Sequence, residues 1–233
     1  MTPAKRIFDL LLALVLVLAL LPVMGLIAAL IALCDGRPVF HRSERMKTLD
    51  HAFILWKFRS MRPSSEPDGA TGGDKAARIT PLGRTLRRSR LDELPQLFNI
   101  LRGDMSFVGP RPPLRRHVND HRSLYARVLR NRPGLTGLAT LRFHRIEDRL
   151  LSVCRTAQET EQVYATRCIA RKARLDLLWA SHASLWVDLW LLVQTVSSLW
   201  LRPAVTRDKD RRISLRDRSS AAPPTGPARR RPG

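Results

Sequence analysis

The chain has 233 residues, of which 41 are Lys or Arg and 20 are Asp or Glu, so its formal charge near pH 7 is +21. Such an excess predicts a polyanionic partner: a nucleic acid, an anionic membrane surface or a phosphorylated substrate. Aromatic residues make up only 6% of the chain, and no common nucleic-acid-binding motif is present. Composition therefore favours a membrane and a phosphate over a nucleic acid. The three cysteines lack metal-ligand spacing and indicate free thiols in a reducing compartment.

An uncharged segment from Leu10 to Cys34 dominates the N-terminal region. As a helix it would be about 37 Å long, enough to cross a hydrocarbon core of about 30 Å. Pro22 lies at its midpoint and predicts a kink. Basic residues flank both ends, so the positive-inside rule assigns no orientation to a single span. The residues alone leave two alternatives open: a spanning anchor, or a re-entrant helix that dips into the bilayer with both flanks on the cytoplasmic face.

Two strands are expected after this segment, over 37–42 and 52–61. In the second, alternation places Lys57 and Arg59 on one face, where they would present two cations to an anion. An ordinary exposed strand face explains the same spacing. The following Gly-, Ser-, Pro- and Asp-rich stretch, 63–75, predicts a mobile loop.

The central helix is expected to begin near two adjacent carboxylates, Asp92 and Glu93. Leu91, Leu94, Phe98 and Leu101 recur at helical spacing and would face the core, whereas Asp92, Gln96 and Asn99 would share a polar face. Carboxylates of this kind can hold Mg²⁺ or attack phosphorus. The competing interpretation is structural: Ser89 and Asp92 have the spacing of a capping box, and both acids would then only favour the helix dipole.

Two tight turns follow. In Gly109–Pro112 two prolines fix the backbone of Arg111, whose guanidinium can fork onto phosphate oxygens. A plain turn would not need the arginine. In Arg132–Gly137 the glycines would let the backbone approach a flat ligand closely, and we expect Pro133, Gly134 and Thr136 to bind a nucleotide. A simple connector remains the alternative for this second turn.

The stretch from Arg174 to Leu201 mixes four tryptophans with apolar and ionisable residues. It is too polar for a membrane span, and the pattern favours amphipathic helices in the headgroup layer over helices packed in the core. From Arg202 onward the chain carries ten Lys or Arg and three Asp, with many prolines and no periodicity. This basic tail is expected to be disordered.

Motifs spread over about Lys5 to Leu201 resemble the bacterial sugar transferase family, the monotopic phosphoglycosyl transferases that start polyprenol-linked glycan assembly. The likeness rests on many motifs in a fixed order, which makes it far more specific than a single pattern. These motifs are Lys5–Asp9, Lys57–Met61, Arg78–Thr80, Leu91–Leu97, Gly103–Ser106, Val108–Pro112, Pro133–Gly137, Asp176 and Ser184–Asp188.

The resemblance implies transfer of a sugar 1-phosphate from a UDP-sugar to a polyprenyl (undecaprenyl) phosphate, with release of UMP. It implies that Asp92 is the nucleophile, forming a phosphosugar-aspartyl intermediate, and that Glu93 assists. Mg²⁺ would bridge Asp92 and the diphosphate, because a divalent cation offsets the repulsion between carboxylates and phosphates. Arg111 would bind phosphate, with Lys57 and Arg59 as weaker candidates.

The fold that follows is α+β and predominantly helical: a re-entrant membrane helix over 1–36, a cytoplasmic sugar-phosphate transferase domain over 37–201 and the basic tail over 202–233. A small β-hairpin and interfacial amphipathic helices would surround the catalytic core, as in the small, single-hairpin subclass. The resemblance favours the re-entrant alternative, with the kink near Pro22. It places the protein at the bacterial inner membrane, with the catalytic domain on the cytoplasmic face.

The expected partners are a UDP-sugar, polyprenyl phosphate and membrane lipid, without nucleic acid; a homodimer stays open. The transferred sugar and the polymer, whether exopolysaccharide, capsule, O-antigen or a glycoprotein glycan, are unspecified. Several positions depart from the family pattern: Leu21 stands where the family commonly has Ser before the kink proline, Lys47 and Asp50 where glycines are usual after the first strand, and Thr140 where it often has Gln. The rival hypothesis is a non-catalytic, membrane-anchored basic protein that binds anionic lipid or nucleic acid.

Overall fold

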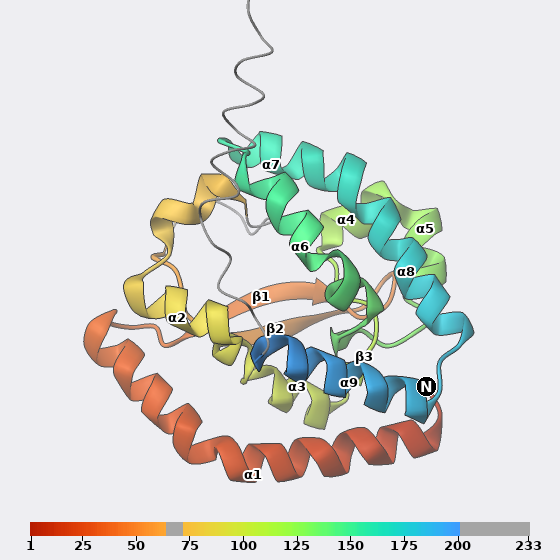
Figure 1. Cartoon of the computed structure of the whole chain (residues 1–233), viewed down its shortest axis with the longest axis horizontal. Helices are drawn as coiled ribbons and strands as arrows, with labels where there is room; N and C mark the ends of the chain where they lie inside the picture. The colour runs from red at the N-terminus through yellow and green to blue at the C-terminus, as the bar shows by residue number, and fades with distance from the viewer. Residues whose placement is uncertain (64–71, 201–233) are drawn as a thin grey trace, which may run out of the picture. The chain divides into compact units, whose positions relative to one another are not determined.

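The computed structural model describes residues 1–63 and 72–200 (Figure 1). Most of the predicted loop over 63–75 and the whole predicted tail over 202–233 lie outside these residues. The chain divides into two units, Met1–Ser197 and Ser198–Gly233. The first unit contains the elements from α1 to most of α9. This unit is mostly helical with a small two-stranded hairpin, which confirms the predicted α+β class.

The N-terminal element is one long helix, α1 (Pro3–Cys34), that contains Pro22 and is visibly bent in Figure 1. The Thr2 hydroxyl accepts a hydrogen bond from the Lys5 backbone N–H and caps the first turn. Among the residues that the structure describes, α1 is the one helix long and apolar enough to cross a membrane, judged by length and composition. Membrane association therefore fits this element.

Both ends of α1 are fastened to the rest of the unit. Near its start, Arg6 donates to the carbonyl oxygens of Ile100 and Leu101 at 2.7 and 2.9 Å, and Lys5 forms an ion pair with Asp188. Just beyond its end, buried Arg59 donates to the carbonyl oxygens of Asp35 and Gly36, both at 2.6 Å. Charge-assisted bonds of this kind are among the stronger ones in proteins, so they hold α1 at its two ends.

A β-hairpin follows, with β1 (Phe40–Met46) antiparallel to β2 (Ala52–Phe58) and Phe40 opposite Phe58. The predicted pair of strands is confirmed, although β1 starts later and runs further than expected. The alternation in β2 holds from Phe53 to Leu55, which are buried on either side of exposed Ile54, but it ends there, because Phe58 is buried although it was expected on the face of Ile54. The Asn99 side chain accepts from the backbone N–H of Trp56 and donates to the carbonyl of Ile54, pairing the outer edge of β2.

The predicted central helix is in fact two elements, a 3₁₀ turn η2 (Leu91–Glu93) and the helix α3 (Gln96–Arg102), and a separate helix, α2 (Pro81–Ser89), precedes them. Arg90, in the left-handed conformation at φ 60°, ends α2 and turns the chain into η2. Pro95 then precedes α3. These breaks shift the helical phase, so Leu97 and Ile100 are buried and Phe98 is exposed, contrary to the predicted core face.

The capping-box interpretation of the two carboxylates is wrong. The Ser89 hydroxyl donates back to the carbonyls of Thr85 and Leu86 and caps nothing in η2. Asp92 and Glu93 are both buried, which a role limited to the helix dipole would not require.

The remaining helices pack around the hairpin (Figure 1), and three buried apolar clusters all include hairpin residues: Phe53 and Leu55, Met46, and Phe58 respectively. A short parallel pair, β3 (Ser106–Val108) and β4 (Gly134–Thr136), lies beside them. The other elements are η1 (Gly73–Arg78), α4 (Arg115–Asp120), α5 (Arg122–Val128), α6 (Leu138–Ser152), α7 (Ala157–Val163), the π-helix η3 (Tyr164–Ile169), α8 (Ala170–Ser181) and α9 (Leu185–Trp200).

An apolar outer surface runs along α1 and α9. On α1, Leu11, Leu18 and Leu26 are more than half exposed, and on α9 Trp186 is 81% exposed. Lys5 and Asp188 join the two helices, and the Trp179 indole N–H donates to the same Asp188 carboxylate at 2.9 Å. Trp179 is therefore a core residue, whereas Trp186 and Trp190 of α9 face outward.

Candidate active site

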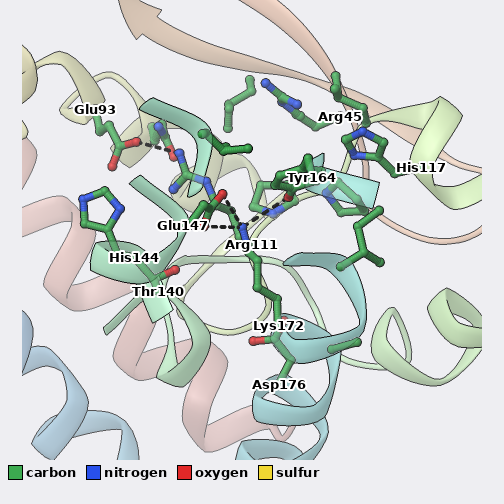
Figure 2. A pocket seen from close by; sticks show the side chains of 18 of the residues that line it. Arg45, Glu93, Arg111, His117, Thr140, His144, Glu147, Tyr164, Lys172 and Asp176 are labelled. Carbon is green, nitrogen blue, oxygen red and sulfur yellow. Dashed lines mark hydrogen bonds and ion pairs between the residues drawn. The ribbon is translucent and has the colours of Figure 1, made fainter. Parts of the chain in front are cut away.

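The two carboxylates of η2 line a cavity of about 300 Å³ whose lining comes mainly from β2, η2, α5, α6, η3 and α8. Figure 2 shows the arrangement, with Glu93 on one side and Asp176 on the other. We call the part formed by Lys57, Asp92, Glu93 and Arg111 the dyad end. The part formed by Tyr125, Glu147, Tyr164, Lys172 and Asp176 is the distal end.

Glu93 is the anion that organises the dyad end. Its Oε1 accepts from Lys57 Nζ at 2.9 Å and from Arg111 Nη2 at 3.0 Å, and its Oε2 lies 3.5 Å from Arg90 Nη1. Burial opposes ionisation, but the charges of Lys57, Arg111 and Arg90 outweigh it and hold the pKa of Glu93 well below its ordinary value. Glu93 is therefore ionised and fixes two cations at the cavity surface.

Asp92 differs from its neighbour because its carboxylate is not committed to a protein partner. Its residue surface is 8% exposed, and within the described part of the chain no group donates a hydrogen bond to it. Burial, and then the neighbouring charge of Glu93, raise the pKa of Asp92, while Lys57, Arg87 and Arg90 act in the opposite direction. A basic, unpartnered carboxylate facing a cavity has the properties of a nucleophile.

The same carboxylate suits a magnesium ion. Over residues 1–63 and 72–200 there is no cluster of three or more His, Cys, Asp or Glu residues that could hold a metal by itself. Mg²⁺ does not need one, because it commonly uses one or two carboxylates and completes its shell with phosphate oxygens and water. Asp92 thus fits as a single protein ligand shared with a phosphate substrate.

Arg111 reaches Glu93 because the backbone before it is held by the β3–β4 pair. The Gly109 N–H donates to the Thr136 carbonyl at 2.9 Å, and the Gly134 N–H donates to the Pro110 carbonyl at 2.8 Å. A Cβ atom on Gly134 would lie 2.1 Å from the Gly109 nitrogen. Only glycine permits so close an approach.

The residues expected to bind a nucleotide are thus placed elsewhere. Pro133, Gly134 and Thr136 do not line the cavity; they lie in or next to β4, and the Thr136 hydroxyl is 2.9 Å from that of Thr195. The glycine serves close contact between two backbones and not contact with a flat ligand. These residues position Arg111 and do not touch the cavity.

Arg59 is also separated from the site. The structure brings Lys57 to the cavity, but Arg59 follows the end of β2 and its guanidinium holds the carbonyls after α1. We therefore do not retain Arg59 as a phosphate ligand.

The distal end is a second polar cluster that the sequence did not predict. Lys172 Nζ lies 2.9–3.0 Å from both carboxylate oxygens of Glu147 and 3.2 Å from the Tyr164 hydroxyl, as the dashed lines in Figure 2 mark. Asp176, one turn further along α8, also lines the cavity and is 8% exposed. Asp176 is one of the residues that carry the family resemblance, but nothing in the local sequence pattern indicated that it lines a cavity.

Two histidines that lie in polar, arginine-rich stretches of the sequence line the cavity as well. His117 is 4% exposed, stacks on Tyr164 with ring centroids 4.9 Å apart and pairs with Glu161. His144 lies 3.3 Å from Asp148, and burial lowers its pKa. The arginines around both histidines in the sequence hid this location, because local polarity suggests exposure. The four-residue spacing of His144 and Asp148 on one helix was an available signal.

Comparison with known proteins agrees with this geometry. Residues 1–202 match the family model described as bacterial sugar transferase. The chain is 35% identical over 203 residues to the "UDP-glucose:undecaprenyl-phosphate glucose-1-phosphate transferase" of Xanthomonas campestris pv. campestris, covering 82% of this chain and 38% of that protein.

Two further relatives carry different names. The "Exopolysaccharide production protein ExoY" of Rhizobium meliloti (strain 1021) is 34% identical over 85% of this chain and 86% of its own length. The "UDP-N-acetylgalactosamine-undecaprenyl-phosphate N-acetylgalactosaminephosphotransferase" of Aeromonas hydrophila is 33% identical over 84% of this chain and 43% of its own length. The chain thus spans less than half of the longer relatives. With its motifs, its fold and a family match over nearly all described residues, the chain belongs to the bacterial sugar transferase family.

Proposed function

We propose that this protein transfers a sugar 1-phosphate from a UDP-sugar to undecaprenyl phosphate, releasing UMP and starting the assembly of a glycan such as an exopolysaccharide. The observation that carries the proposal is the dyad end: a buried Asp92 without a protein partner beside Glu93, which holds Lys57 and Arg111. Relatives whose names state this class of reaction are similar in sequence to this chain over more than four fifths of its length.

The reaction proceeds in two displacements. The Asp92 carboxylate attacks the phosphorus that bears the sugar, the bond from this phosphorus to the bridging oxygen breaks, and UMP leaves with the electron pair. An oxygen of the lipid phosphate then attacks the same phosphorus and releases the carboxylate, giving a polyprenyl diphosphate sugar. The covalent route splits one difficult transfer into two easier ones.

The cations of the dyad end support both displacements. Lys57 and Arg111 stabilise the extra negative charge that develops on the phosphate oxygens, and Glu93 keeps both in place before substrate arrives. Asp92 would also hold Mg²⁺, which supplies positive charge to the diphosphate when bound.

The same proposal places α1 as a re-entrant helix at the bacterial inner membrane, with both flanks and the catalytic unit on the cytoplasmic face. Support comes from its fastened ends: Arg6 and Arg59 bind the backbone on opposite sides of the bend within one unit. A straight span would separate those ends by the thickness of the bilayer. The exposed tryptophans Trp186 and Trp190 of α9 suit the headgroup layer.

This topology predicts that the two flanks are labelled from the same side. Single cysteines at Thr2 and at Arg42, in a chain whose three native cysteines are replaced by Ser, should both react with an impermeant maleimide in inverted membrane vesicles and neither in intact spheroplasts. Asp120→Cys, at an exposed position of α4 in the catalytic unit, is the matched control for labelling from the cytoplasmic side. Labelling of Thr2→Cys and Arg42→Cys from opposite sides would establish a span and contradict the re-entrant helix.

The activity is tested directly with membranes that contain the full chain. Incubation with UDP-glucose, UDP-galactose and UDP-N-acetylgalactosamine should release UMP from at least one donor, and sustained release should require undecaprenyl phosphate. Without the lipid, release should stop at about one UMP per enzyme, because the aspartyl adduct cannot turn over. Absence of UMP from a full panel of UDP-sugars would contradict the proposed function.

A further inference from the structure

The distal end contains two cavity-lining polar side chains that have no hydrogen-bond partner among the described residues. Asp176 and Tyr125 are each 8% exposed and both line the cavity, and within the described residues no hydrogen bond reaches either side chain. They come from separate helices, α8 and α5. Buried polar groups normally have partners, and those that lack one in a cavity are available to a ligand.

The two ends of the cavity differ in charge. At the dyad end Lys57, Arg87, Arg90 and Arg111 surround two carboxylates, leaving a cationic excess. At the distal end the single lysine, Lys172, is already paired with Glu147 and bonded to Tyr164. Phosphates are therefore drawn to the dyad end, while the distal end offers no free cation among its described residues. A neutral, hydrogen-bonding group suits the distal end.

We infer that the distal end receives the sugar ring of the donor, and that Asp176 and Tyr125 determine which sugar is accepted by bonding its hydroxyl groups. Lys172 and Glu147 hold the surrounding side chains in place. The inference rests on the proposed function and deepens it, because it names the part of the site that selects the substrate.

The donor's other neutral part, the nucleoside, fits this end less well, because its ribose carries only two free hydroxyls and its uracil few donors. Ionised carboxylates only accept hydrogen bonds, and a uracil ring has one N–H to donate. A hexose carries several hydroxyls, each of which both donates and accepts. The hydroxyls of such a ring can form hydrogen bonds with Asp176, with Tyr125 and with the carboxylate of Glu147 at the same time. The Tyr164 ring is less accessible for stacking with a base, because His117 stacks on it and Lys172 lies 5.0 Å from its centroid.

The electrostatics of Asp176 agree with this role. Burial raises its pKa to about 7, and only Lys172 acts against that shift. The other ionisable groups that act on this part of the cavity are Glu147, Tyr125, Tyr164 and, from the dyad end, Arg111. Hydroxyl groups of a sugar would donate hydrogen bonds to the Asp176 carboxylate and stabilise its ionised form. The ligand would thus provide the donors that the protein does not.

The experiment compares sugar recognition with nucleotide recognition in the full chain. Asp176→Asn should lower kcat/KM for the preferred UDP-sugar at least tenfold and change the ratio of kcat/KM among UDP-glucose, UDP-galactose and UDP-N-acetylgalactosamine. The inhibition constant of UMP should stay within about twofold, because UMP lacks the sugar. Tyr125→Phe should alter the same ratio in a variant that keeps the ring and its packing.

Asp120→Asn, at an exposed position of α4, is the matched control. It should change neither kcat/KM for the UDP-sugars nor the inhibition constant of UMP. A parallel rise in the UMP inhibition constant would assign the distal end to the nucleoside and overturn the inference. An equal loss for every sugar, with an unchanged ratio in both variants, would make the cluster structural and overturn it too. A wild-type chain that releases no UMP from any donor refutes the proposed function itself, and is thereby distinguishable from either result.

Discussion

Replacement of Asp92 by asparagine is expected to abolish UMP release, lowering turnover by at least about a thousandfold. The amide has almost the same shape as the carboxylate but is far too weak a nucleophile to form the adduct. Incubation of wild-type enzyme with donor alone should give a phosphosugar adduct on the peptide that contains Asp92, visible by mass spectrometry, and the variant should give none.

Because no protein group is bonded to Asp92 in the described structure, this substitution should leave folding intact. Burial and the Glu93 charge already disfavour the ionised form of Asp92, so removing its charge should stabilise the chain slightly. The thermal unfolding midpoint in detergent is the control. Full turnover by Asp92→Asn, or an adduct elsewhere in the chain, would assign the nucleophile to another residue.

Glu93→Gln is expected to have the opposite profile, with a large loss of stability as well as of activity. The substitution leaves Lys57 and Arg111 without their common anion in a buried site, and breaking such a pair costs about 3–5 kcal/mol. For a domain of this size that corresponds to about 6–20 °C in the unfolding midpoint. Differential scanning fluorimetry in detergent measures the shift.

The pH dependence of this loss has a definite sign. Since the folded state holds the pKa of Glu93 well below its ordinary value, its contribution is fully present above the unfolded pKa of about 4.3 and is lost as the pH falls through the folded pKa. The difference in unfolding midpoint between wild type and Glu93→Gln should thus be constant from pH 6 to 8 and become smaller in acid. Glu44→Gln, which removes an exposed pair with Arg115, should show little change. An equal shift in both variants would contradict the organising role of Glu93.

Local patterns in the sequence predicted the elements better than their phases. The long apolar part of α1 and the alternation from Phe53 to Leu55 in β2 follow from hydropathy, and both are present in the structure. The central segment differs because Arg90 and Pro95 interrupt it, so a single helical wheel from Leu91 to Leu101 exchanged Phe98 and Leu97 between surface and core. A break of phase is not visible in a periodic pattern that assumes one helix.

The site divides in the same way. The dyad end was predictable, because Asp92 and Glu93 are adjacent in the sequence and two prolines identify the rigid turn around Arg111. The distal end joins α5, α6, η3 and α8, and only tertiary packing brings Tyr125 near Asp176. Glycine at position 134 was correctly seen as a site of close approach, but the partner turned out to be the backbone of Gly109 and not a ligand.

The anchoring of α1 has a mechanical consequence. Arg6 at one end and Arg59 at the other hold the helix to the folded unit, so α1 cannot tilt on its own. Ordinary membrane helices meet a thicker or thinner bilayer by changing their inclination. Under the proposed re-entrant topology, the lipid would have to deform around a fixed wedge, and Asp92 would stay at a constant height above the acyl chains whatever the composition of the leaflet.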